Sequence, residues 1–385
     1  MKILFCHDHR FYKKGDEVYT AGNLYLEKWQ EYLAYADQIT VLARRDPFPK
    51  EGGNNLRLSS GEGVRFHFLP DLFNPKYRLL QRRKILQKIK NEVTEADFVI
   101  VRLPSEIGSF AAKEAIRQNK KWMVEMVGCP WDSFWNFGFK GKSLAHYITN
   151  RTKRLVKQAP SVMYVTSQFL QSRYPTNGKQ IGVSDVELAA VNDSVLSNKI
   201  NHITNSDSLN IGFVGSLDVD YKGLDVLLKA VSQVKSRLPH LHVKVLGKGD
   251  TSKWESFLEE HNVVENTEFL GTLPFGKAVF DFYDSLHLFV LPSKQEGLPR
   301  SLVEAMSRAN PCLGSNAGGI PELLPAKWIH NKGDVEQLAQ HLLDILADKE
   351  TMIEAATANF EKGKDFEIKT LEKRRTEFLK NTITR

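Results

Sequence analysis

Short apolar runs alternate with longer helical stretches along this chain of 385 residues, and this alternation limits the possible folds more than any other feature. Strands that are separated by helices pair in parallel, and the helices then cover both faces of the sheet. The sequence therefore predicts an α/β fold. In the first half we expect strands at 2–6, 38–42, 64–69, 97–101, 121–127, 161–165 and around 186–190, and helices at 20–35, 77–93, 106–118, 143–158 and 167–173.

The length predicts two domains, because 385 residues exceed one comfortable hydrophobic core. We expect a first domain over residues 1–191 and a linker over 192–209, which is rich in Asn, Ser and Asp. A second α/β domain is expected over 210–364, beginning with the strand-like run Asn210–Gly215. The charged, helical segment 365–385 is expected to pack back on the first domain.

The composition argues against several protein classes. No run approaches the ~20 apolar residues that span a bilayer, and the apolar start Met1–Cys6 is too short for a signal peptide. The three cysteines are scattered, so they indicate neither a disulfide framework nor a metal site. We therefore expect a cytosolic protein with reduced thiols.

Positive charge is concentrated in the first half of the chain. Residues 1–200 carry 31 Lys and Arg against 20 Asp and Glu, although the whole chain has a net charge of only +7. Segments 76–90 and 140–157 contain seven and six basic residues and no acidic ones. Basic amphipathic helices favour an anionic membrane surface, but a solvated helix face is an equally good interpretation. Nucleic acid is less favoured, since no known binding module is present.

Two carboxylates frame the most informative motif, which runs from Glu296 to Glu304. A buried-strand pattern, Leu288–Pro292, precedes it, and Pro299 suits the first turn of a helix. Glu296 is then expected at the carboxyl end of a strand, with Glu304 about two turns into the next helix. Ligands bind at this edge of open α/β sheets.

Two further elements of the second half predict a phosphate site. The strand 211–214 ends at Gly215, and Lys222 stands just before the helical pattern 224–230. A helix N-terminus with a lysine beside it attracts a diphosphate, although an isolated surface lysine is the simpler interpretation. The glycine-rich run Ser315–Leu324 leads into another proline-started helix and is expected to border the same site, although two adjacent glycines also simply make turns.

These motifs occur in an order that resembles the nucleotide-binding half of the retaining family 4 glycosyltransferases. The resemblance spans about residues 210–325 and rests on the paired glutamates, Lys222-Gly223, Leu246–Gly249, Phe269–Gly271 and Ser315–Glu322. It implies the GT-B fold, in which two Rossmann-like domains face a cleft. Val101–Ser105 and Val127–Asp132 are similar to bacterial enzymes that build capsular or exopolysaccharide.

The resemblance also implies a role for each matching residue. Glu304 is expected to bind the donor ribose, Glu296 the transferred sugar, and Lys222 the diphosphate. The donor-binding set comprises Gly215, Ser216, Lys222, Gly247, Gly271, Glu296, Gly297, Leu298 and Glu304, with Glu296 and Lys222 as the catalytic residues. The donor is expected to be a UDP- or GDP-type sugar nucleotide, and neither a metal nor another cofactor is implied.

Some positions depart from the family pattern. Ser216 stands where the family often has an arginine, so one phosphate contact is weaker or comes from elsewhere, with Arg300 as a candidate. The first-domain glycine loop is represented by Gly22 or Gly15. On the acceptor side, Asp132 replaces a frequent histidine, although it also suits a turn or helix cap. Arg102 is either an acceptor contact or the partner of a nearby acid.

Three alternatives remain open at this stage. Asp218-Val219-Asp220 imitates a metal motif, but a solvated turn explains it better. A sugar-nucleotide epimerase or hydrolase of the same fold is the enzymatic rival, because it would isomerise or hydrolyse the donor without an acceptor. A catalytically inactive, membrane-associated scaffold is the other rival, and the presence of both glutamates and Lys222 argues against it.

Overall fold

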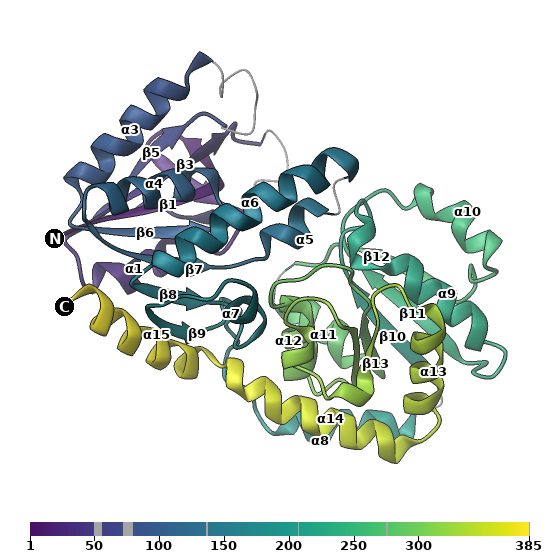
Figure 1. Cartoon of the computed structure of the whole chain (residues 1–385). Helices are drawn as coiled ribbons and strands as arrows, with labels where there is room; N and C mark the ends of the chain where they lie inside the picture. Colours follow the sequence, from purple (N-terminus) through teal and green to yellow (C-terminus); the bar gives the residue numbers. More distant parts are fainter. Residues whose placement is uncertain (50–55, 72–79, 136–137, 207, 275, 385) are drawn as a thin grey trace. The chain divides into compact units, whose positions relative to one another are not determined.

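The computed structural model describes residues 1–49, 56–71, 80–135, 138–206, 208–274 and 276–384 (Figure 1). Its contacts divide the chain into two compact units. Unit 1 contains Met1–Asp185 and Lys373–Arg385, and unit 2 contains Val186–Glu372. Each unit has its own sheet and its own hydrophobic core.

The sheet of unit 1 is parallel in its main part, in the order β5-β3-β1-β6-β7-β8-β9, with β2 and β4 added antiparallel beside the far end of β1. Phe5 of β1 pairs with Val41 of β3 on one side and with Ile100 of β6 on the other. The strands are β1 (Lys2–Lys14), β2 (Glu17–Thr20), β3 (Gln38–Asp46), β4 (Arg57–Leu58), β5 (Val64–Leu69), β6 (Phe98–Leu103), β7 (Lys121–Met126), β8 (Ser161–Tyr164) and β9 (Lys179–Gly182).

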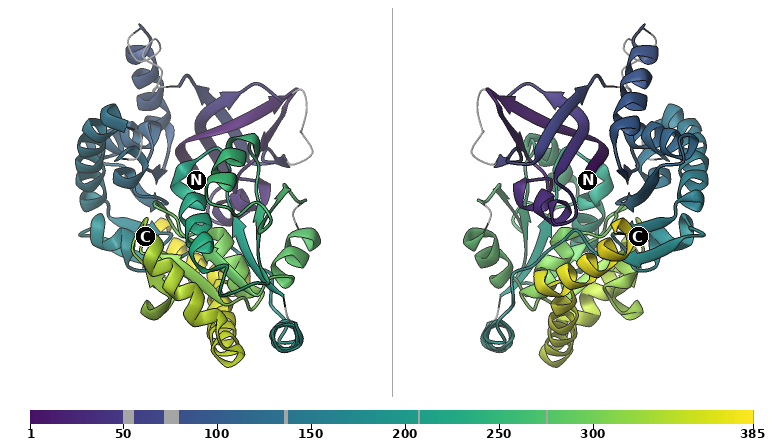
Figure 2. Two further views of the ribbon diagram at one scale, coloured as in Figure 1. Left: turned by 90° about the vertical axis from the view of Figure 1, so that its right-hand side faces the viewer. Right: turned by 90° about the vertical axis from the view of Figure 1, so that its left-hand side faces the viewer.

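Helices cover both faces of this sheet, because successive side chains of a buried parallel strand point to opposite faces. Leu4 and Cys6 of β1 join a core with α3, α4 and α6, whereas Phe5 contacts Trp29 of α1 on the other face. Figure 2 shows the ribbons of helices on both sides of this sheet. The helices are α1 (Leu26–Leu33), α3 (Arg82–Glu95), α4 (Glu106–Arg117), α5 (Pro130–Trp135), α6 (Gly138–Gln158) and α7 (Phe169–Arg173).

The sheet of unit 2 is entirely parallel, in the order β12-β11-β10-β13-β14-β15. Strand order reverses beside β10, because β11 continues on one side of it and β13 lies on the other. In open α/β sheets a ligand binds outside the carboxyl ends of the strands at such a point. The strands are β10 (Leu209–Val214), β11 (Leu241–Leu246), β12 (Thr267–Gly271), β13 (Leu288–Leu291), β14 (Cys312–Ser315) and β15 (Ile329–His330).

Two helix layers also enclose this second sheet. Helices α9 and α13 pack on one face, through residues such as Leu227 and Leu342, and α11 and α12 pack on the other, through Phe282 and Leu302. The helices and 3-10 turns are α8 (Ser194–Asn205), η2 (Asp220–Lys222), α9 (Leu224–Val234), α10 (Ser252–Glu260), α11 (Lys277–Asp284), α12 (Arg300–Ser307), η3 (Ile320–Glu322), η4 (Ala326–Trp328), α13 (Val335–Leu346), α14 (Lys349–Gly363), η5 (Lys364–Phe366) and α15 (Ile368–Ile383).

The segment 192–209, which the sequence predicts as a linker, instead contains helix α8 of unit 2. Lys199 of α8 is buried, and its ammonium donates to the carbonyls of Tyr283, Asp284 and Leu286 and to the side chain of Asn310. A polar composition suggested a linker, but a buried, fully bonded lysine fixes the segment as part of a folded unit.

Other differences concern element boundaries. The strand expected around 186–190 lies earlier, at β9, and the helix expected from residue 20 begins only at Leu26, after the short strand β2. The first three residues of the predicted helix 77–93 lie outside the described residues, as do 76–79 of the first basic segment. Within the described ranges, no helix has both the length and the apolar character needed to cross a membrane.

Candidate active site

Lys222 and Glu296 meet at the carboxyl edge of the unit 2 sheet. Lys222 follows β10 and Glu296 follows β13, so the reversal of strand order brings the two loops together. The Lys222 ammonium lies 2.7 Å from Oε1 of Glu296, and the two side chains are 21% and 8% exposed. The sequence predicts separate roles for these two residues, and the structure makes them direct partners.

Ser293 holds the same carboxylate from the other side. Its hydroxyl donates to Oε1 of Glu296 at 2.7 Å, and its own carbonyl accepts a hydrogen bond from the hydroxyl of Ser315. Two donors therefore fix one oxygen of Glu296 and define the direction of the other. Sequence reasoning missed Ser293, although its position between the end of β13 and Glu296 is a readable signal.

Gly223 explains how Lys222 reaches this position. Its φ of +78° is left-handed, and a Cβ on it would lie 2.1 Å from the carbonyl oxygen of Pro292. Only glycine therefore allows the β10–α9 loop to lie this close to the loop after β13. Helix α9 begins at the next residue, Leu224, so the ammonium and the helix N-terminus lie together, as an anion site requires.

Three of the predicted donor-binding glycines end neighbouring strands. Gly215 follows β10, Gly247 follows β11, and Gly271 ends β12. The N–H of Gly247 donates to the carbonyl of Gly271 at 2.7 Å, and a Cβ on Gly247 would lie 1.8 Å from the carbonyl oxygen of Gly215. The hydroxyl of Ser216 accepts from the N–H of Asp218 within its own turn. We call the strand ends at Gly215, Gly247 and Gly271 the glycine rim, because they expose backbone and no side chain beside Lys222.

The glycine-rich run after β14 closes on the Glu296 loop. The N–H of Gly319 donates to the carbonyl of Gly297 at 2.7 Å, and a Cβ on Gly318 would lie 2.3 Å from the carbonyl oxygen of Glu296. This contact holds the backbone of Gly297 and the neighbouring Leu298 in one conformation. The structure thus brings a third predicted element to the same place.

Glu304 has its own partner within unit 2. It is the fifth residue of α12, so it lies little more than one turn into the helix, not two. The hydroxyl of the fully buried Tyr283 donates to its Oε2 at 3.1 Å. Burial raises the pKa of Glu304, while Arg300 and the Tyr283 hydrogen bond act to lower it. Tyr283 carries no motif, so the sequence offers no signal for it.

The acceptor-side candidates of unit 1 are already engaged. Arg102 is buried and donates to Glu125 at 3.2 Å and to Asp185 at 2.8 Å, which favours the ion-pair role over an acceptor contact. Asp132, also buried, accepts from Arg173 at 3.1 Å. Both charges are therefore balanced inside unit 1.

Gly22 lies beside a histidine that the sequence did not single out. A Cβ on Gly22 would lie 2.8 Å from Cε1 of His9, whose ring nitrogen Nε2 is 2.7 Å from the hydroxyl of Thr20. Burial lowers the pKa of His9 to about 4, so the ring is neutral at neutral pH. His9 lies where the register of β1 shifts against β3, and such bulges often re-aim side chains at sites.

A cavity of about 270 Å³ lies near this irregular part of β1. The carboxylate of Asp8 accepts hydrogen bonds from the first two N–H groups of α4, those of Glu106 and Ile107. The Arg44 side chain donates to the backbone carbonyl of Asp8. Burial lowers the pKa of His7 well below its usual value. The cavity offers a neutral imidazole and charged groups for a polar ligand; its lining includes His7, Asp8, Arg44, Ser105, Glu106 and Arg151.

The loop Asp218–Asp220 carries no sign of a metal site. Asp218 pairs with Lys253 at 3.1 Å, as expected for a solvated turn. In the part of the chain that the structure describes, no group of three or more His, Cys, Asp or Glu side chains could hold a metal ion.

Comparison with known proteins finds a family model, sequence relatives and solved structures that are similar to this chain. Residues 208–348 match the family model described as "Glycosyl transferases group 1". Protein CapJ of Staphylococcus aureus is 29% identical over 384 residues, covering 99% of this chain and 95% of CapJ. The putative colanic acid biosynthesis glycosyltransferase WcaL of Escherichia coli (strain K12) is 31% identical over 134 residues, which cover 31% of this chain and 32% of WcaL.

The fold is also that of solved structures. Anabaena Alr3699/HepE, crystallised in complex with UDP, superposes with a TM-score of 0.68 at 15% identity, and the match covers 99% of this chain and 100% of that chain. The predicted α/β architecture of the GT-B type is therefore confirmed, and the similarity to the group 1 glycosyl transferase model lies in residues 208–348.

Proposed function

We propose that this chain, whose matches support a group 1 glycosyltransferase with the GT-B fold, moves a sugar from a nucleoside diphosphate to a glycan or lipid-linked acceptor. We place it in retaining family 4 and in the synthesis of a surface polysaccharide. The similarity to CapJ and WcaL supports that setting. The contact between Lys222 and Glu296 at the strand-order reversal of unit 2 is the observation that carries the proposal.

The chemistry explains why a cation and a carboxylate belong together there. When the bond between the anomeric carbon and the phosphate oxygen breaks, positive charge grows on the sugar and negative charge on the leaving nucleotide. Lys222 and the N-terminus of α9 stabilise the phosphate, and Glu296 stabilises the sugar. Losing one such preorganised contact costs about 2.7–4 kcal/mol in the transition state.

The remaining residues orient the donor. Glu304 accepts hydrogen bonds from the ribose hydroxyls, and the backbone N–H groups of Gly297 and Leu298 face the sugar and its phosphate. Gly215, Ser216, Gly247 and Gly271 let the nucleotide lie close to the strand ends. The donor is a UDP- or GDP-type sugar nucleotide: HepE was solved with UDP-glucose, and a GDP-mannose-dependent mannosyltransferase of Corynebacterium glutamicum is 30% identical over 141 residues.

Retention follows if the acceptor hydroxyl attacks from the face that the phosphate leaves. The oxygen of the acceptor forms a bond to the anomeric carbon, and its proton passes to the departing phosphate oxygen. This route requires neither a protein base nor a metal, since Lys222 and backbone N–H groups supply the positive charge. For the acceptor we favour the strand ends of unit 1 near His7 and His9, because Arg102 and Asp132 are already paired.

Replacing Glu296 by glutamine tests this assignment most directly. We expect transfer to fall about 100- to 1,000-fold, while the nucleotide still raises the melting temperature of the protein. The matched control is Glu268→Gln, which removes an exposed carboxylate from β12 of the same unit and should leave transfer unchanged. A panel of sugar nucleotides with an acceptor extract provides the assay.

The same assay separates the rival functions. An isomerised or hydrolysed donor, formed equally well without an acceptor, would establish the epimerase or hydrolase alternative. Binding of a nucleotide with no turnover of any donor would favour the inactive scaffold. Full transfer activity in the Glu296→Gln variant would contradict the proposed site.

A further inference from the structure

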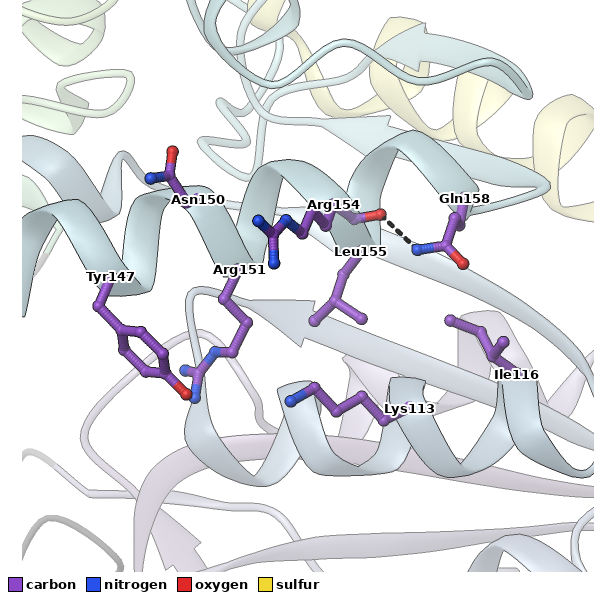
Figure 3. A pocket seen from close by; sticks show the side chains of 8 residues that line it. All are labelled: Lys113, Ile116, Tyr147, Asn150, Arg151, Arg154, Leu155 and Gln158. Atoms are coloured by element: carbon purple, nitrogen blue, oxygen red, sulfur yellow. Dashed lines mark hydrogen bonds between the residues drawn. The ribbon is translucent and has the colours of Figure 1, made fainter.

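A groove lies between α4 and α6 of unit 1 (Figure 3). Its volume is about 450 Å³. All of its charged lining residues are basic, and none is acidic. The residues that matter for its chemistry are Lys113 and Ile116 of α4 and Tyr147, Arg151, Arg154 and Leu155 of α6. The proposed donor site uses none of them.

Arg151 gives the groove a built, buried cation. The residue is only 9% exposed, and one of its terminal nitrogens pairs with Glu106 beneath the groove. Its Nε is buried and has no hydrogen-bond partner among the described residues. A buried guanidinium with an unbonded N–H is only partly compensated by Glu106, so its charge favours an anion in the adjacent groove.

Two exposed cations border the same space. Figure 3 shows the Lys113 ammonium extending toward Arg151, with the Arg154 guanidinium on the neighbouring turn of α6. Neither Lys113 nor Arg154 has an acidic partner within the described parts of the chain. Since Glu106 balances one charge, the groove keeps a net positive charge close to the Tyr147 hydroxyl, which lies beside Arg151 in Figure 3. Such a set of donors matches a phosphate group.

The other end of the groove carries two apolar side chains and the amide of Gln158. Leu155 and Ile116 lie beyond the cations in Figure 3, and Ile116 is 38% exposed. Tyr147 at the charged end exposes 56% of its surface. A free phosphate would gain nothing from this apolar wall, whereas a lipid would place its phosphate on the cations and its first methylene groups against the wall.

We propose that the α4–α6 groove binds the phosphate of an anionic membrane lipid and thereby docks unit 1 on a lipid surface. The site goes beyond the proposed transferase function, because lipid binding here does not depend on the donor site of unit 2. The sequence predicts a membrane-binding surface along residues 140–157, and this proposal places the lipid contact in one groove beside that segment. The basic segment 76–90 is not needed for it.

The test compares two double variants that remove the same charge from unit 1. Lys113→Gln/Arg154→Gln empties the groove of its exposed cations, and both side chains are exposed, so folding should be retained. The control Lys153→Gln/Lys157→Gln removes two exposed cations from α6 that do not line the groove. Binding is measured by co-sedimentation with phosphatidylcholine vesicles that either contain or lack phosphatidylglycerol.

We expect the unchanged protein to bind only the vesicles with phosphatidylglycerol. The groove variant should bind them at least about 10-fold more weakly, because it loses two cations that contact the lipid phosphate directly, and the control, which keeps both contacts, should change by less than about 3-fold. Equal weakening in both variants would show a diffuse electrostatic attraction and overturn the groove. No binding to either vesicle would overturn the proposal altogether.

A further pair of measurements identifies the ligand. Ile116→Ser should weaken binding to the vesicles, because it removes part of the apolar wall, and should leave binding of inorganic phosphate unchanged. Tight binding of inorganic phosphate without vesicle binding would indicate a soluble phosphate ligand instead of a lipid. Stabilisation of the groove variant by sugar nucleotides should equal that of the unchanged protein, so that failure here is distinct from failure of the donor site.

Discussion

Each unit contains a basic side chain that is bonded to a carboxylate, but the two pairs are built differently. In unit 1, Arg102 is buried and its planar guanidinium donates to two acids, Glu125 and Asp185. In unit 2, Lys222 donates to one acid, Glu296, and remains 21% exposed. Both cations keep N–H donors beyond these bonds, so exposure makes the difference: an incoming anion can reach Lys222, whereas the Arg102 side chain is only 9% exposed.

Comparing the two ion pairs gives two observable properties that distinguish a structural ion pair from a binding site. The first is the exposure of the cation, which decides whether an anion can reach it. The second is the backbone around the pair, because glycines surround Lys222 and Glu296 where side chains would block a ligand. A charged pair at a strand end is therefore no evidence of function until its remaining donors and its access are known.

The largest expected difference between the two ion pairs is in the unfolding free energy of variants that lack the cation. Arg102→Met leaves two acids without their buried partner, and we expect unfolding free energy to fall by about 3–5 kcal/mol. Lys222→Met should cost much less, because Ser293 still donates to Glu296, but it should weaken stabilisation by the nucleotide. Chemical denaturation with and without nucleotide measures both quantities. A larger loss of stability for the Lys222 variant would reverse the assignment of structural and binding pairs.

Crowding at the glycine rim should have the next largest effect. Gly247→Ala places a Cβ 1.8 Å from the Gly215 carbonyl oxygen, and we expect a cost of about 1–3 kcal/mol and at least a 10-fold loss of donor affinity. Gly271→Ala meets no neighbour but has a φ of +66°, so it costs about 1–2 kcal/mol through backbone strain alone. Calorimetric titration of both variants should find the donor affinity of Gly271→Ala nearer to normal. Equal losses would argue against close approach of a ligand at Gly247.

The smallest effect is expected at the Tyr283 hydroxyl. Tyr283→Phe removes a hydrogen bond to Glu304, and such bonds to charged groups contribute about 1.5–3 kcal/mol. We expect the donor KM to rise about 10-fold with little change in kcat. The bond lowers the pKa of Glu304, so its loss raises that pKa further, and donor binding should begin to fail at a higher pH on acidification.

The control for this pH profile is Tyr221→Phe, which removes a phenol hydroxyl from η2 without touching Glu304. Its donor KM and its acidic limb should stay normal. An unshifted acidic limb in Tyr283→Phe would show that Glu304 does not need to be ionised for donor binding.

The periodic parts of the fold could be predicted, because a buried parallel strand is a short apolar run with a recognisable length. β5 and β13 begin and end within a residue of the predicted ranges. The segment 192–209 was wrongly predicted as a linker because its composition is polar. The burial of Lys199 depends on hydrogen bonds to carbonyl groups more than 80 residues away in the sequence. The short strand β2 pairs with the far end of β1, which no local pattern reveals.

The site could be predicted where glycine and charge accompany strand ends. Lys222, Gly223, Glu296 and the loop at Gly318 carry such signals and do come together. Tyr283 could not be found this way, because it is an ordinary buried aromatic residue of α11 until its hydroxyl meets Glu304. Contacts between side chains of different helices and strands depend on how these elements pack, and the sequence of a single segment does not determine that packing.

The ammonium of Lys199 also has a consequence for nucleotide binding. It bonds the carbonyl of Tyr283, and the hydroxyl of the same tyrosine bonds Glu304, so one residue joins α8 to the carboxylate proposed to bind ribose. If Glu304 binds the ribose as proposed, loosening of α8 should weaken donor binding, and by thermodynamic reciprocity a bound donor should stabilise α8 by the same free energy. The helix in the segment predicted as a linker would then support the proposed ribose site from a distance.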